Sequence, residues 1–478
     1  MSSISDRNVV IVGAGPSGLA AAEELVRFGI PCTILDDQKQ PGGQYLRQLS
    51  PEIQSTDTNP PLLDICSHRL VEFRCETTVW DFPAPRTLAW VSGTGNGRLN
   101  TRALILATGA YDRPVPFEGW TLPGVVSAGG LVNLYKSQRV VAGSRVVVAG
   151  NGPLLLTAAQ CMLQAGAEVL ALVEAAPFST QVIRHFPGLL TQPGLLRKGM
   201  GYRFGLWYRS VPVLEQQVVT GARGDHWIEQ IEVRALDNKG KICPERCVEF
   251  DVDALVTGYG LMPSLELTRL AGCRHSFHST DAAWVAERST DLETSVPGVY
   301  VVGDGASVAG YQNAMVEGRI AALAILTKEE PSPRVSAALK AAIRQRNRRQ
   351  KFSQALANCY RTPLDYSALV TPDTVICRCE NVLLSEITPM LTDAAPVPSL
   401  ARVKSETRAG MGRCGGRNCM PFLFRLLSSA TGQPNESITL PRARPPARPI
   451  RIGDLFSEEL PDPDLPDDPH EPRGAKVR

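Results

Sequence analysis

The chain has 478 residues, of which 43% are apolar and 21% are charged, with 50 basic against 48 acidic residues. This is the composition of an ordinary globular protein, and the length allows two or three domains. A net charge of +2 argues against the basic surface of a nucleic-acid-binding protein. No apolar run reaches the length of roughly 20 residues that a membrane-spanning helix needs. The sequence therefore predicts a globular protein without nucleic acid or a transmembrane segment.

The cysteine content agrees with an intracellular protein. The first eight residues are polar and lead directly into a predicted strand, so no export signal is expected. Without export, the twelve cysteines should be free thiols in a reducing compartment. The predicted location is therefore the cytoplasm.

The first motif is a glycine-rich turn that follows a β-branched strand at residues 9–12. Residues Gly13–Gly18 match the pattern GxGxxG and lead into a helix of small residues, from residue 19 to about 28. A second strand at 32–35 then ends in Asp36. Strand, turn, helix, strand and acid together form the βαβ fingerprint of a dinucleotide site.

Each part of this fingerprint has a mechanical role. Gly13 makes the tight turn, Gly15 lets backbone N–H groups approach a pyrophosphate, and Gly18 lets helix and strand pack closely. The helix N-terminus offers unpaired donors and a partial positive charge to the phosphates. Asp36 is placed to accept hydrogen bonds from a ribose hydroxyl. The alternative, a glycine-rich turn without a ligand, stays open at this point.

Two distant segments favour FAD over NAD in the first unit. A strand at 103–106 ends in the turn Ala107–Gly109, and a strand at 299–302 ends in Gly303 and Asp304, before a helix from 312 to about 326. Both resemble hallmarks of two-dinucleotide flavoprotein reductases. In that family the aspartate holds the ribityl chain of FAD and the following helix points at the flavin ring. Asp304 could instead be only a turn residue.

A third segment, Gly42 to Gln44, resembles a loop of that family that lies close to the flavin. The residues expected to bind the cofactor all come from these motifs. They are Gly13, Gly15, Pro16, Ser17, Gly18, Asp36, Gly43, Gln44, Thr108, Gly109, Gly303 and Asp304.

A second dinucleotide-like unit follows at residue 145. A strand leads into the glycine pair Gly150 and Gly152, but Leu155 occupies the third glycine position. A leucine there would push the helix away from the strand or block ligand approach. Glu174 stands where a ribose-binding acid belongs. A weak NAD or adenine-nucleotide site is therefore the lesser alternative to a Rossmann-like domain that serves no nicotinamide.

Four cysteines show the spacing of metal ligands. Cys377 and Cys379 form a Cys-x-Cys pair, and Cys414 and Cys419 follow as Cys-x4-Cys within a glycine-rich stretch. Four thiolates can hold zinc or a [2Fe–2S] cluster, but Cys-x-Cys is unusual for structural zinc. Helical segments follow each pair, and the arrangement looks like the bacterioferritin-associated-ferredoxin type of [2Fe–2S] module. No Cys-x-x-Cys occurs beside either dinucleotide unit, so a redox-active disulfide is not expected.

Taken together, these motifs resemble the α-type (A) subunit of heteromeric flavin-dependent opine and amino-acid dehydrogenases. That family includes opine oxidases, hydroxyproline and proline dehydrogenases, and the flavin subunits of hydrogen cyanide synthase. The resemblance covers roughly residues 8–455, and Leu155 is similar to the family at its position. Tyr45-Leu46-Arg47 departs from the order expected there. The segments that carry the resemblance are PGGQYLR (41–47), GNGPLLL (150–156), VICRCE (375–380), RAGMG (408–412) and PPARP (445–449).

The resemblance implies chemistry in a complex. A separate β subunit, similar to D-amino-acid oxidase, would oxidise a secondary amine, and this chain would relay electrons through FAD and [2Fe–2S] to a quinone or dye. The resemblance also allows an FMN at a subunit interface, a small [2Fe–2S] γ subunit, and a peripheral place at the inner membrane. NAD(P) is not expected. No catalytic residue is assigned, because His185, His226, His275 and His278 form no recognisable constellation.

Three other functions stay open. The first is glycine oxidation, as in hydrogen cyanide synthase. The second is a stand-alone NAD(P)H-dependent reductase that passes electrons through flavin to iron–sulfur, which would need a working second site. The third is a non-enzymatic scaffold that keeps its cofactors for stability.

The predicted fold is an α/β, two-dinucleotide-binding-domain flavoprotein with a small helical [2Fe–2S] domain. After about residue 439 the chain is Pro-rich and then acidic, which predicts a tail that is disordered or draped on a partner. A basic stretch at 344–351 is expected to be a solvated helix face. The predicted division is 1–140 and 256–330 for the FAD domain, 141–255 for the second Rossmann unit, 331–370 for a connector, 371–440 for the [2Fe–2S] domain and 441–478 for the tail.

Overall fold

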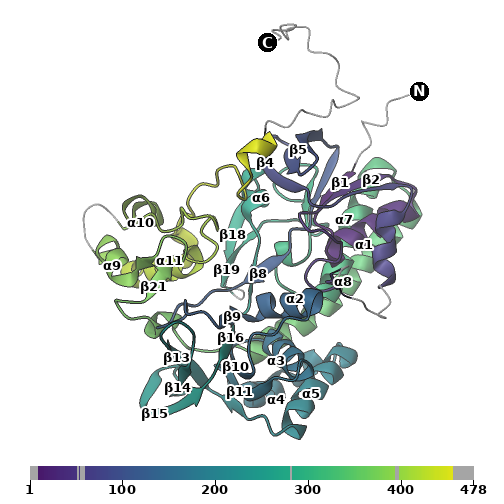
Figure 1. Ribbon diagram of the computed structural model, residues 1–478. Helices are drawn as coiled ribbons and strands as arrows, with labels where there is room; N and C mark the ends of the chain where they lie inside the picture. Colours follow the sequence, from purple (N-terminus) through teal and green to yellow (C-terminus); the bar gives the residue numbers. More distant parts are fainter. Residues whose placement is uncertain (1–8, 51–52, 54–59, 280–281, 393–397, 456–478) are drawn as a thin grey trace.

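The structure is a computed structural model that describes residues 9–50, 53, 60–279, 282–392 and 398–455 (Figure 1). Its first unit is built on a five-stranded parallel sheet in the order β20-β7-β1-β2-β3. Every residue of β1, β2, β7 and β20 is buried, as expected for a parallel sheet covered on both faces. The strands are β1 (Val9–Val12), β2 (Cys32–Leu35), β3 (Val71–Arg74), β7 (Ala103–Leu106) and β20 (Val299–Val301).

Helices α1 (Pro16–Arg27) and α7 (Tyr311–Glu329) pack against each other beside this sheet. Their backbones approach closely because Gly318 has no side chain: a Cβ there would lie 2.0 Å from the carbonyl oxygen of Ser17. The 27-residue helix α8 (Pro333–Cys359) packs on α7 and contains the basic stretch at 344–351. The remaining elements of the unit are η2 (Pro61–Ser67), η3 (Gly303–Gly305) and the antiparallel sheet of β4 (Thr78–Ala84), β5 (Thr87–Ser92) and β6 (Gly95–Asn100).

The second unit repeats the parallel-sheet plan in the order β12-β11-β10-β16-β9. It also contains the antiparallel sheet β13-β14-β15. Its helices are α2 (Ala128–Gln138), α3 (Leu154–Gln164), α4 (Phe178–Leu189) and α5 (Pro193–Tyr208). Its strands are β9 (Val125–Ser127), β10 (Arg145–Gly150), β11 (Glu168–Glu174), β12 (Val213–Glu215), β13 (Gln217–Arg223), β14 (Gln230–Leu236), β15 (Ile242–Asp251) and β16 (Ala254–Gly258).

The second unit begins earlier in the chain than residue 141. Strand β9 pairs with β16, and Leu131 and Val132 of α2 are buried in the same core as Leu155. Strand β9 lies at the edge of the sheet and has no dinucleotide motif. It belongs to the second unit because it pairs with β16, about 130 residues later in the chain. Small elements then join the two units: β8 (Ala110–Asp112) with β17 (Leu261–Pro263), α6 (Glu266–Leu270), and β18 (His275–His278) with β19 (Ala283–Ala286).

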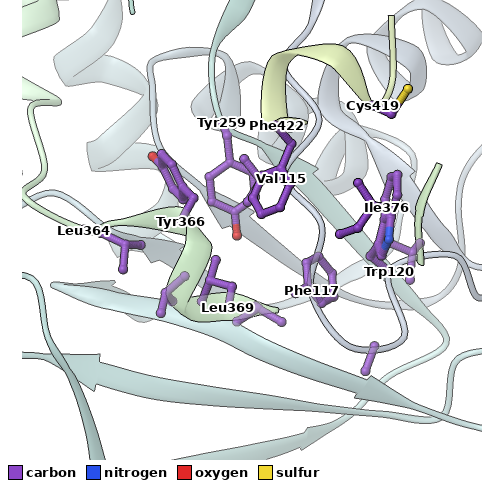
Figure 2. Packing of buried hydrophobic residues seen from close by; sticks show 14 of the residues in the cluster. Val115, Phe117, Trp120, Tyr259, Leu364, Tyr366, Leu369, Ile376, Cys419 and Phe422 are labelled. Carbon is purple, nitrogen blue, oxygen red and sulfur yellow. The ribbon is translucent and has the colours of Figure 1, made fainter. Parts of the chain in front are cut away.

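The cysteine-containing region lies on the second unit rather than apart from it. Its elements are η4 (Tyr366–Leu369), β21 (Val375–Cys377), β22 (Val382–Leu383), α9 (Leu384–Thr392), α10 (Leu400–Thr407), α11 (Met420–Thr431) and η5 (Asn435–Ser437). One hydrophobic core includes Phe117 and Trp120 of the second unit together with Ile376 and Phe422 (Figure 2). The indole N–H of Trp120 also donates to the Val375 carbonyl at 2.6 Å. The two regions are therefore packed as one body.

The described part of the C-terminal tail packs on the first unit. The Ala447 N–H donates to the carbonyl of Trp80 at 2.8 Å, and the Arg448 guanidinium pairs with Asp37. Asn96 donates to the carbonyl of Asp454, in the short helix η6 (Ile452–Leu455), at 2.8 Å. The sequence predicted a tail that is disordered or draped on a partner, but up to residue 455 it is draped on its own chain. The remainder of that prediction concerns residues outside the described ranges.

Across the part of the chain that the structure describes, no helix is both long and apolar enough to cross a bilayer.

Candidate functional site

The glycine-rich loop after β1 has two glycines that packing requires and one that it does not. Gly13 has φ of +109°, and a Cβ there would lie 2.4 Å from the Ala107 carbonyl oxygen. A Cβ on Gly18 would lie 1.9 Å from the Gly13 carbonyl oxygen. At Gly15, by contrast, the nearest atom is 4.0 Å away, so a side chain would enter open space at the N-terminus of α1. That space is where a phosphate would meet the helix N–H groups.

Asp36 follows β2 and is 7% exposed. Its carboxylate accepts hydrogen bonds from the N–H groups of Ala14 and, at 2.8 Å, of Gln38. Burial raises the pKa of this carboxyl, against the lowering effect of those two N–H groups. The acid is therefore held against the glycine-rich loop, at the sheet edge where the sequence motif predicted a ribose contact.

The loop at 42–44 and the turn after β7 lie beside the same space. Gly43 is so close to the glycine-rich loop that a Cβ on it would be 2.9 Å from Gly15 Cα. Gln44 Nε2 donates to the Ala110 carbonyl at 2.7 Å, and Thr108 Oγ1 donates to the Ser264 carbonyl at 3.1 Å. The chain turns at Gly109 with φ of +68°.

The loop after β20 is held from two sides. Asp304 Oδ1 accepts from the N–H of Ala309 at 3.0 Å and of Gly310 at 3.2 Å. The Gly303 N–H donates to Glu317 Oε2 at 2.9 Å. Arg288 binds the same buried carboxylate through both guanidinium nitrogens, at 2.7 and 3.0 Å. The sequence analysis missed this pair, because no motif links a strand-end arginine to a helical glutamate 29 positions later.

An aromatic pair was also missed. The rings of Tyr45 and Tyr311 stack with centroids 3.6 Å apart and planes 12° from parallel. Lys136 Nζ lies 5.1 Å from the Tyr45 ring centroid and donates to the Tyr45 carbonyl at 2.9 Å. Tyr311 is the first residue of α7. The departure at Tyr45 from the expected order of residues was the one local signal that this position is special.

These groups share one edge of one sheet. The glycine-rich loop, Asp36, the turn at 107–109 and the loop at 303–304 follow β1, β2, β7 and β20, whose carboxyl ends meet at the same edge because the strands are parallel. The open space at Gly15, the N-terminus of α1 and the buried carboxylate of Asp36 fit the phosphates and ribose of a dinucleotide.

The second unit differs from the first at Leu155, whereas the place that corresponds to Gly15 is open, since a Cβ on Gly152 would meet nothing within 4 Å. A Cβ on Gly150 would lie 2.0 Å from the Gly258 carbonyl oxygen, so the tight turn is kept. Leu155 is fully buried, and its Cδ2 would lie 3.0 Å from a Cβ on Gly258. The leucine thus fills the contact between helix and strand that a third glycine would leave open.

Glu174, at the end of β11, is 0% exposed. One carboxylate oxygen pairs with the Arg203 guanidinium, which also lies 3.8 Å from the ring centroid of Phe178. Its other oxygen has no hydrogen-bond partner among the described residues. The residue in the place of a ribose-binding acid is therefore enclosed and already faces a cation.

The four cysteines of the motif come together as two pairs. The thiols of Cys377 and Cys419 interact directly, as do those of Cys379 and Cys414, and Cys419 feels the charge of all three others. The hydrogen bond from Cys419 lowers the pKa of the Cys377 thiol to about 5, with backbone N–H groups of residues 410, 380 and 379 adding to it. Cys377 and Cys419 are buried, and Cys379 and Cys414 are half-buried.

The glycines around these thiols have a steric reason. A Cβ on Gly412 would lie 2.2 Å from Cys379 Cβ, so only glycine allows this approach. Within residues 9–50, 53, 60–279, 282–392 and 398–455, no three or more His, Cys, Asp or Glu side chains are grouped tightly enough for one metal ion. The four thiols thus come from two segments, residues 377–379 and 414–419, that the fold brings together.

Through Arg417 the cysteine loop contacts the elements that join the two units. Its Nε donates to Glu266 Oε1 at 2.5 Å, and its guanidinium carbon lies 5.6 Å from the ring centroid of Tyr111. Tyr111 is next to Ala110, whose carbonyl accepts from Gln44. A cavity of about 540 Å³ lies at this junction, lined in part by Tyr111, Arg417 and the start of the tail.

Comparison with known proteins agrees with this geometry. The family described as pyridine nucleotide-disulphide oxidoreductase matches residues 7–318, which is more than half of the chain. The chain belongs to the pyridine nucleotide-disulphide oxidoreductase family. It is an oxidoreductase of a flavoprotein fold, as the sequence predicted.

Several relatives match this chain over almost its whole length. The A subunit of opine oxidase from Agrobacterium tumefaciens (strain Ach5) is 30% identical over 94% of this chain and 91% of the relative. The hydrogen cyanide synthase protein HcnB of Pseudomonas aeruginosa is 32% identical over 91% of this chain and 95% of the relative. L-proline dehydrogenase from P. horikoshii has a similar fold, with a TM-score of 0.66 and 19% identity over 94% of this chain and 79% of that one. The predicted resemblance is thereby confirmed.

Despite the family's name, the described residues of this member contain no disulfide. All twelve cysteines are free thiols. That no redox-active disulfide lies beside either unit stays a prediction.

Proposed function

We propose that this chain is the α-type subunit of a heteromeric dehydrogenase that oxidises the secondary amine of an amino acid or opine. In this proposal it holds FAD and a [2Fe–2S] cluster and relays electrons from a substrate-oxidising flavoprotein β subunit to a quinone-type or artificial acceptor. The observation that carries the proposal is the contact of the cysteine loop, through Arg417, with Tyr111 of the joining strand β8. An FMN at the subunit interface and a small [2Fe–2S] γ subunit stay predictions.

FAD would lie along the carboxyl edge of the first sheet. The N–H groups at the start of α1 would bind its pyrophosphate beside Gly15, Pro16, Ser17 and Gly18. Asp36 would accept from the ribose, and Asp304 would face the ribityl chain. A bound flavin supplies a site that takes two electrons together and releases them singly. The residues of this chain supply its orientation and exclude water on the protein side.

The cysteine quartet fits two iron atoms better than one zinc ion. A structural zinc site needs four ligands around one point. Here Cys377 and Cys379 form a Cys-x-Cys pair, which is unusual for structural zinc, and all four thiols lie near enough to influence one another, as the ligands of one two-iron cluster would. Backbone N–H groups around Cys377 would stabilise the negative charge of bound sulfur.

The second unit favours a source of electrons other than NAD(P)H. Leu155 takes the place of the third glycine, which lets helix and strand pack closely, and Glu174 is enclosed against Arg203. The adenosine ribose of NAD(P)H would have to displace that guanidinium. This supports electron delivery by a partner, because the acid that would bind the ribose is already paired with the chain's own arginine.

The substrate chemistry is assigned to the partner. A flavin of the partner would accept the hydride from the substrate Cα–H, the amine would lose a proton, and a C=N bond would form. Water then hydrolyses this imine to a free amino acid and a keto acid. The two electrons pass on through this chain. The chain is 32% identical to HcnB and 30% identical to the opine oxidase relative, so glycine stays an alternative substrate.

The proposal is tested with the chain purified under nitrogen, alone and together with its partner subunit. Flavin absorbance, iron content and the electron paramagnetic resonance signal of the reduced protein report the cofactors. We expect both cofactors, flavin bleaching by amine substrate only when the partner is present, and no bleaching by NADH.

Two results would contradict it. Rapid bleaching of the isolated chain by NADH would identify a stand-alone reductase. Oxidation of amino acids by the isolated chain at the rate of the complex would place the substrate chemistry here rather than in a partner.

A further inference from the structure

Helices α4 and α5 expose an unusual number of large apolar side chains. Their exposed fractions range from 44% to 79%. We call this set the α4–α5 patch, and its members are Ile183, Phe186, Leu190, Met200, Phe204, Trp207 and Tyr208. Figure 1 shows both helices at the lower edge of the molecule, far from the end of the described chain at β4 and β5.

On α5 the exposed residues form one continuous face. Met200, Phe204, Trp207 and Tyr208 have the spacing i, i+4, i+7, i+8, which places them on the same side of a helix. The rings of Phe204 and Trp207 lie 5.4 Å apart. Leu206, on the opposite side, is fully buried in the second unit's core. The outward direction of the aromatic face is therefore set by the packing of the inward one.

The charge on the two helices is mainly positive, and one acid, Glu215, accepts from Ser179 at the start of α4. Between Glu174 and Glu215 the sequence has no acidic residue and five Lys or Arg residues. One of the five, Arg203, pairs with Glu174 in the interior. The other four, Arg184, Arg197, Lys198 and Arg209, are exposed on or beside the patch. An apolar face with more cations than acids beside it is suited to a surface that is negatively charged outside and apolar within.

We propose that the α4–α5 patch docks this chain on the surface of an anionic lipid bilayer. Aromatic and aliphatic side chains enter the boundary between headgroups and acyl chains, and the surrounding cations bind the anionic headgroups. Tyr and Trp suit this boundary because their rings are apolar but carry one polar group, and Phe suits its apolar side. The helices lie on the membrane and do not span it.

The patch is also close to the flavin side of the molecule. On the same helix, Lys198 and Tyr202 are near enough to Tyr311 and Tyr45 to act on them electrostatically. Both of these α5 side chains lie on the side of the helix opposite the aromatic face, so docking through the patch would place the stacked tyrosines behind the helix, roughly one helix diameter of about 10 Å from the membrane surface. This inference rests on the proposed function in one respect, namely that a quinone-type acceptor lies in that membrane.

The test is co-sedimentation of the complete, cofactor-loaded chain with lipid vesicles. One vesicle type contains phosphatidylcholine alone, and the other has half of its lipid replaced by phosphatidylglycerol. We expect binding to the anionic vesicles that weakens as salt is added. The double variant Phe204→Ser, Trp207→Ser should bind at least about tenfold more weakly. The triple variant Arg184→Gln, Arg197→Gln, Arg209→Gln should bind about a hundredfold more weakly.

Matched controls separate the patch from general surface character. Val248→Ser removes an exposed apolar side chain from β15, and Arg98→Gln, Lys239→Gln, Arg246→Gln removes three exposed charges elsewhere. Both controls should bind as the wild type does. Absent binding to anionic vesicles, or binding that the patch variants leave unchanged, would overturn the inference. Patch variants that bind vesicles normally but lose the partner subunit would show a protein interface instead.

A separate readout distinguishes this inference from the proposed function. With a water-soluble dye as acceptor, and with the partner subunit present, the patch variants should oxidise substrate at the wild-type rate. Reduction of a quinone carried in anionic vesicles should fall with vesicle binding. If the wild-type complex does not reduce the dye, the proposed function is refuted. The vesicle-binding result would then still report on the patch alone.

Discussion

Arg417 lies over the ring of Tyr111, with 5.6 Å between the guanidinium carbon and the ring centroid. Arg417 belongs to the loop between Cys414 and Cys419, and Tyr111 belongs to strand β8 beside the predicted flavin turn. This contact joins the two predicted redox sites through two neighbouring side chains. Arg417 is at the same time paired with Glu266.

Replacing Arg417 by methionine should slow electron transfer more than it affects folding. The ion pair is partly exposed, so the loss of unfolding free energy should be only about 1 kcal/mol. The rate at which substrate reduces the iron–sulfur cluster should fall by about tenfold or more, measured by rapid freezing and electron paramagnetic resonance. Arg408→Met, which removes the exposed pair with Glu380, is the control. An unchanged rate in the Arg417 variant would count against the proposed electron path.

Gly15→Ala should separate flavin binding from folding. The added Cβ meets nothing nearer than 4.0 Å in the protein, so the melting temperature without cofactor should stay close to that of the wild type. The methyl group enters the phosphate space, and flavin affinity should fall by about tenfold or more. Flavin absorbance per chain after dialysis measures this. Gly194→Ala, in an open position on α5, should retain the flavin fully, and equal flavin content in both variants would argue against phosphate binding at Gly15.

Serine at Cys377 or Cys414 should remove iron and leave the flavin. One variant comes from each thiol pair, and a hydroxyl is a much weaker ligand for iron than a thiolate. Metal analysis and the flavin spectrum check both cofactors in one preparation. Cys75→Ser changes an exposed thiol outside the quartet and should keep iron and flavin alike. Iron retained in both quartet variants would show that these residues are not the ligands.

Arg203→Met should destabilise the second unit in a pH-dependent way. It leaves the buried Glu174 carboxylate without its cation, at a cost of about 3–5 kcal/mol near neutral pH. Burial raises the pKa of Glu174 above its ordinary value of 4.5, and loss of Arg203 raises that pKa further. Below the pKa of the unfolded carboxyl, Glu174 is protonated in both states and the variant keeps its full unfolding free energy. As pH rises towards the raised folded-state pKa, this stability is lost, because the buried carboxyl resists ionisation that the unfolded chain allows.

Urea unfolding across the acidic to neutral range should thus show the Arg203→Met penalty shrinking as pH falls towards 4.5. The double variant Glu174→Met, Arg203→Met removes both charges and should recover most of the stability at pH 7. A penalty that is independent of pH would mean that lost packing on Phe178, rather than the stranded carboxylate, causes the effect.

His275 should contribute to acid sensitivity. Burial, followed by the charge of Arg269, lowers the pKa of His275 from its ordinary 6.5 to about 4. Its stabilising contribution is present above pH 6.5 and is lost as pH falls towards 4, to an extent of up to about 3 kcal/mol. The difference in unfolding free energy between wild type and His275→Gln, measured from pH 7 to 4, should change by that amount in favour of the variant. A constant difference would show that His275 does not titrate in this range.

The sequence by itself determined the local motifs. The glycine-rich turns, the buried strands that precede them, Asp36 and the spacing of four cysteines are short-range patterns whose chemistry depends on nearby residues. They were enough to predict the fold class and the family, both of which are confirmed. They were also enough to mark Leu155 as a departure from the full dinucleotide fingerprint, whereas the enclosure of Glu174 by Arg203 was not visible in them.

Only the tertiary structure decided how these parts meet. Arg203 reaches Glu174 across 29 positions, Arg288 reaches Glu317, Trp120 holds Val375 across 255 positions, and the tail returns to Trp80 and Asp37. Such contacts follow from the packing of whole elements, and the free energy of that packing is spread over many residues. No local pattern records it, so the shared core beneath the cysteines and the outward face of α5 became visible only in the folded chain.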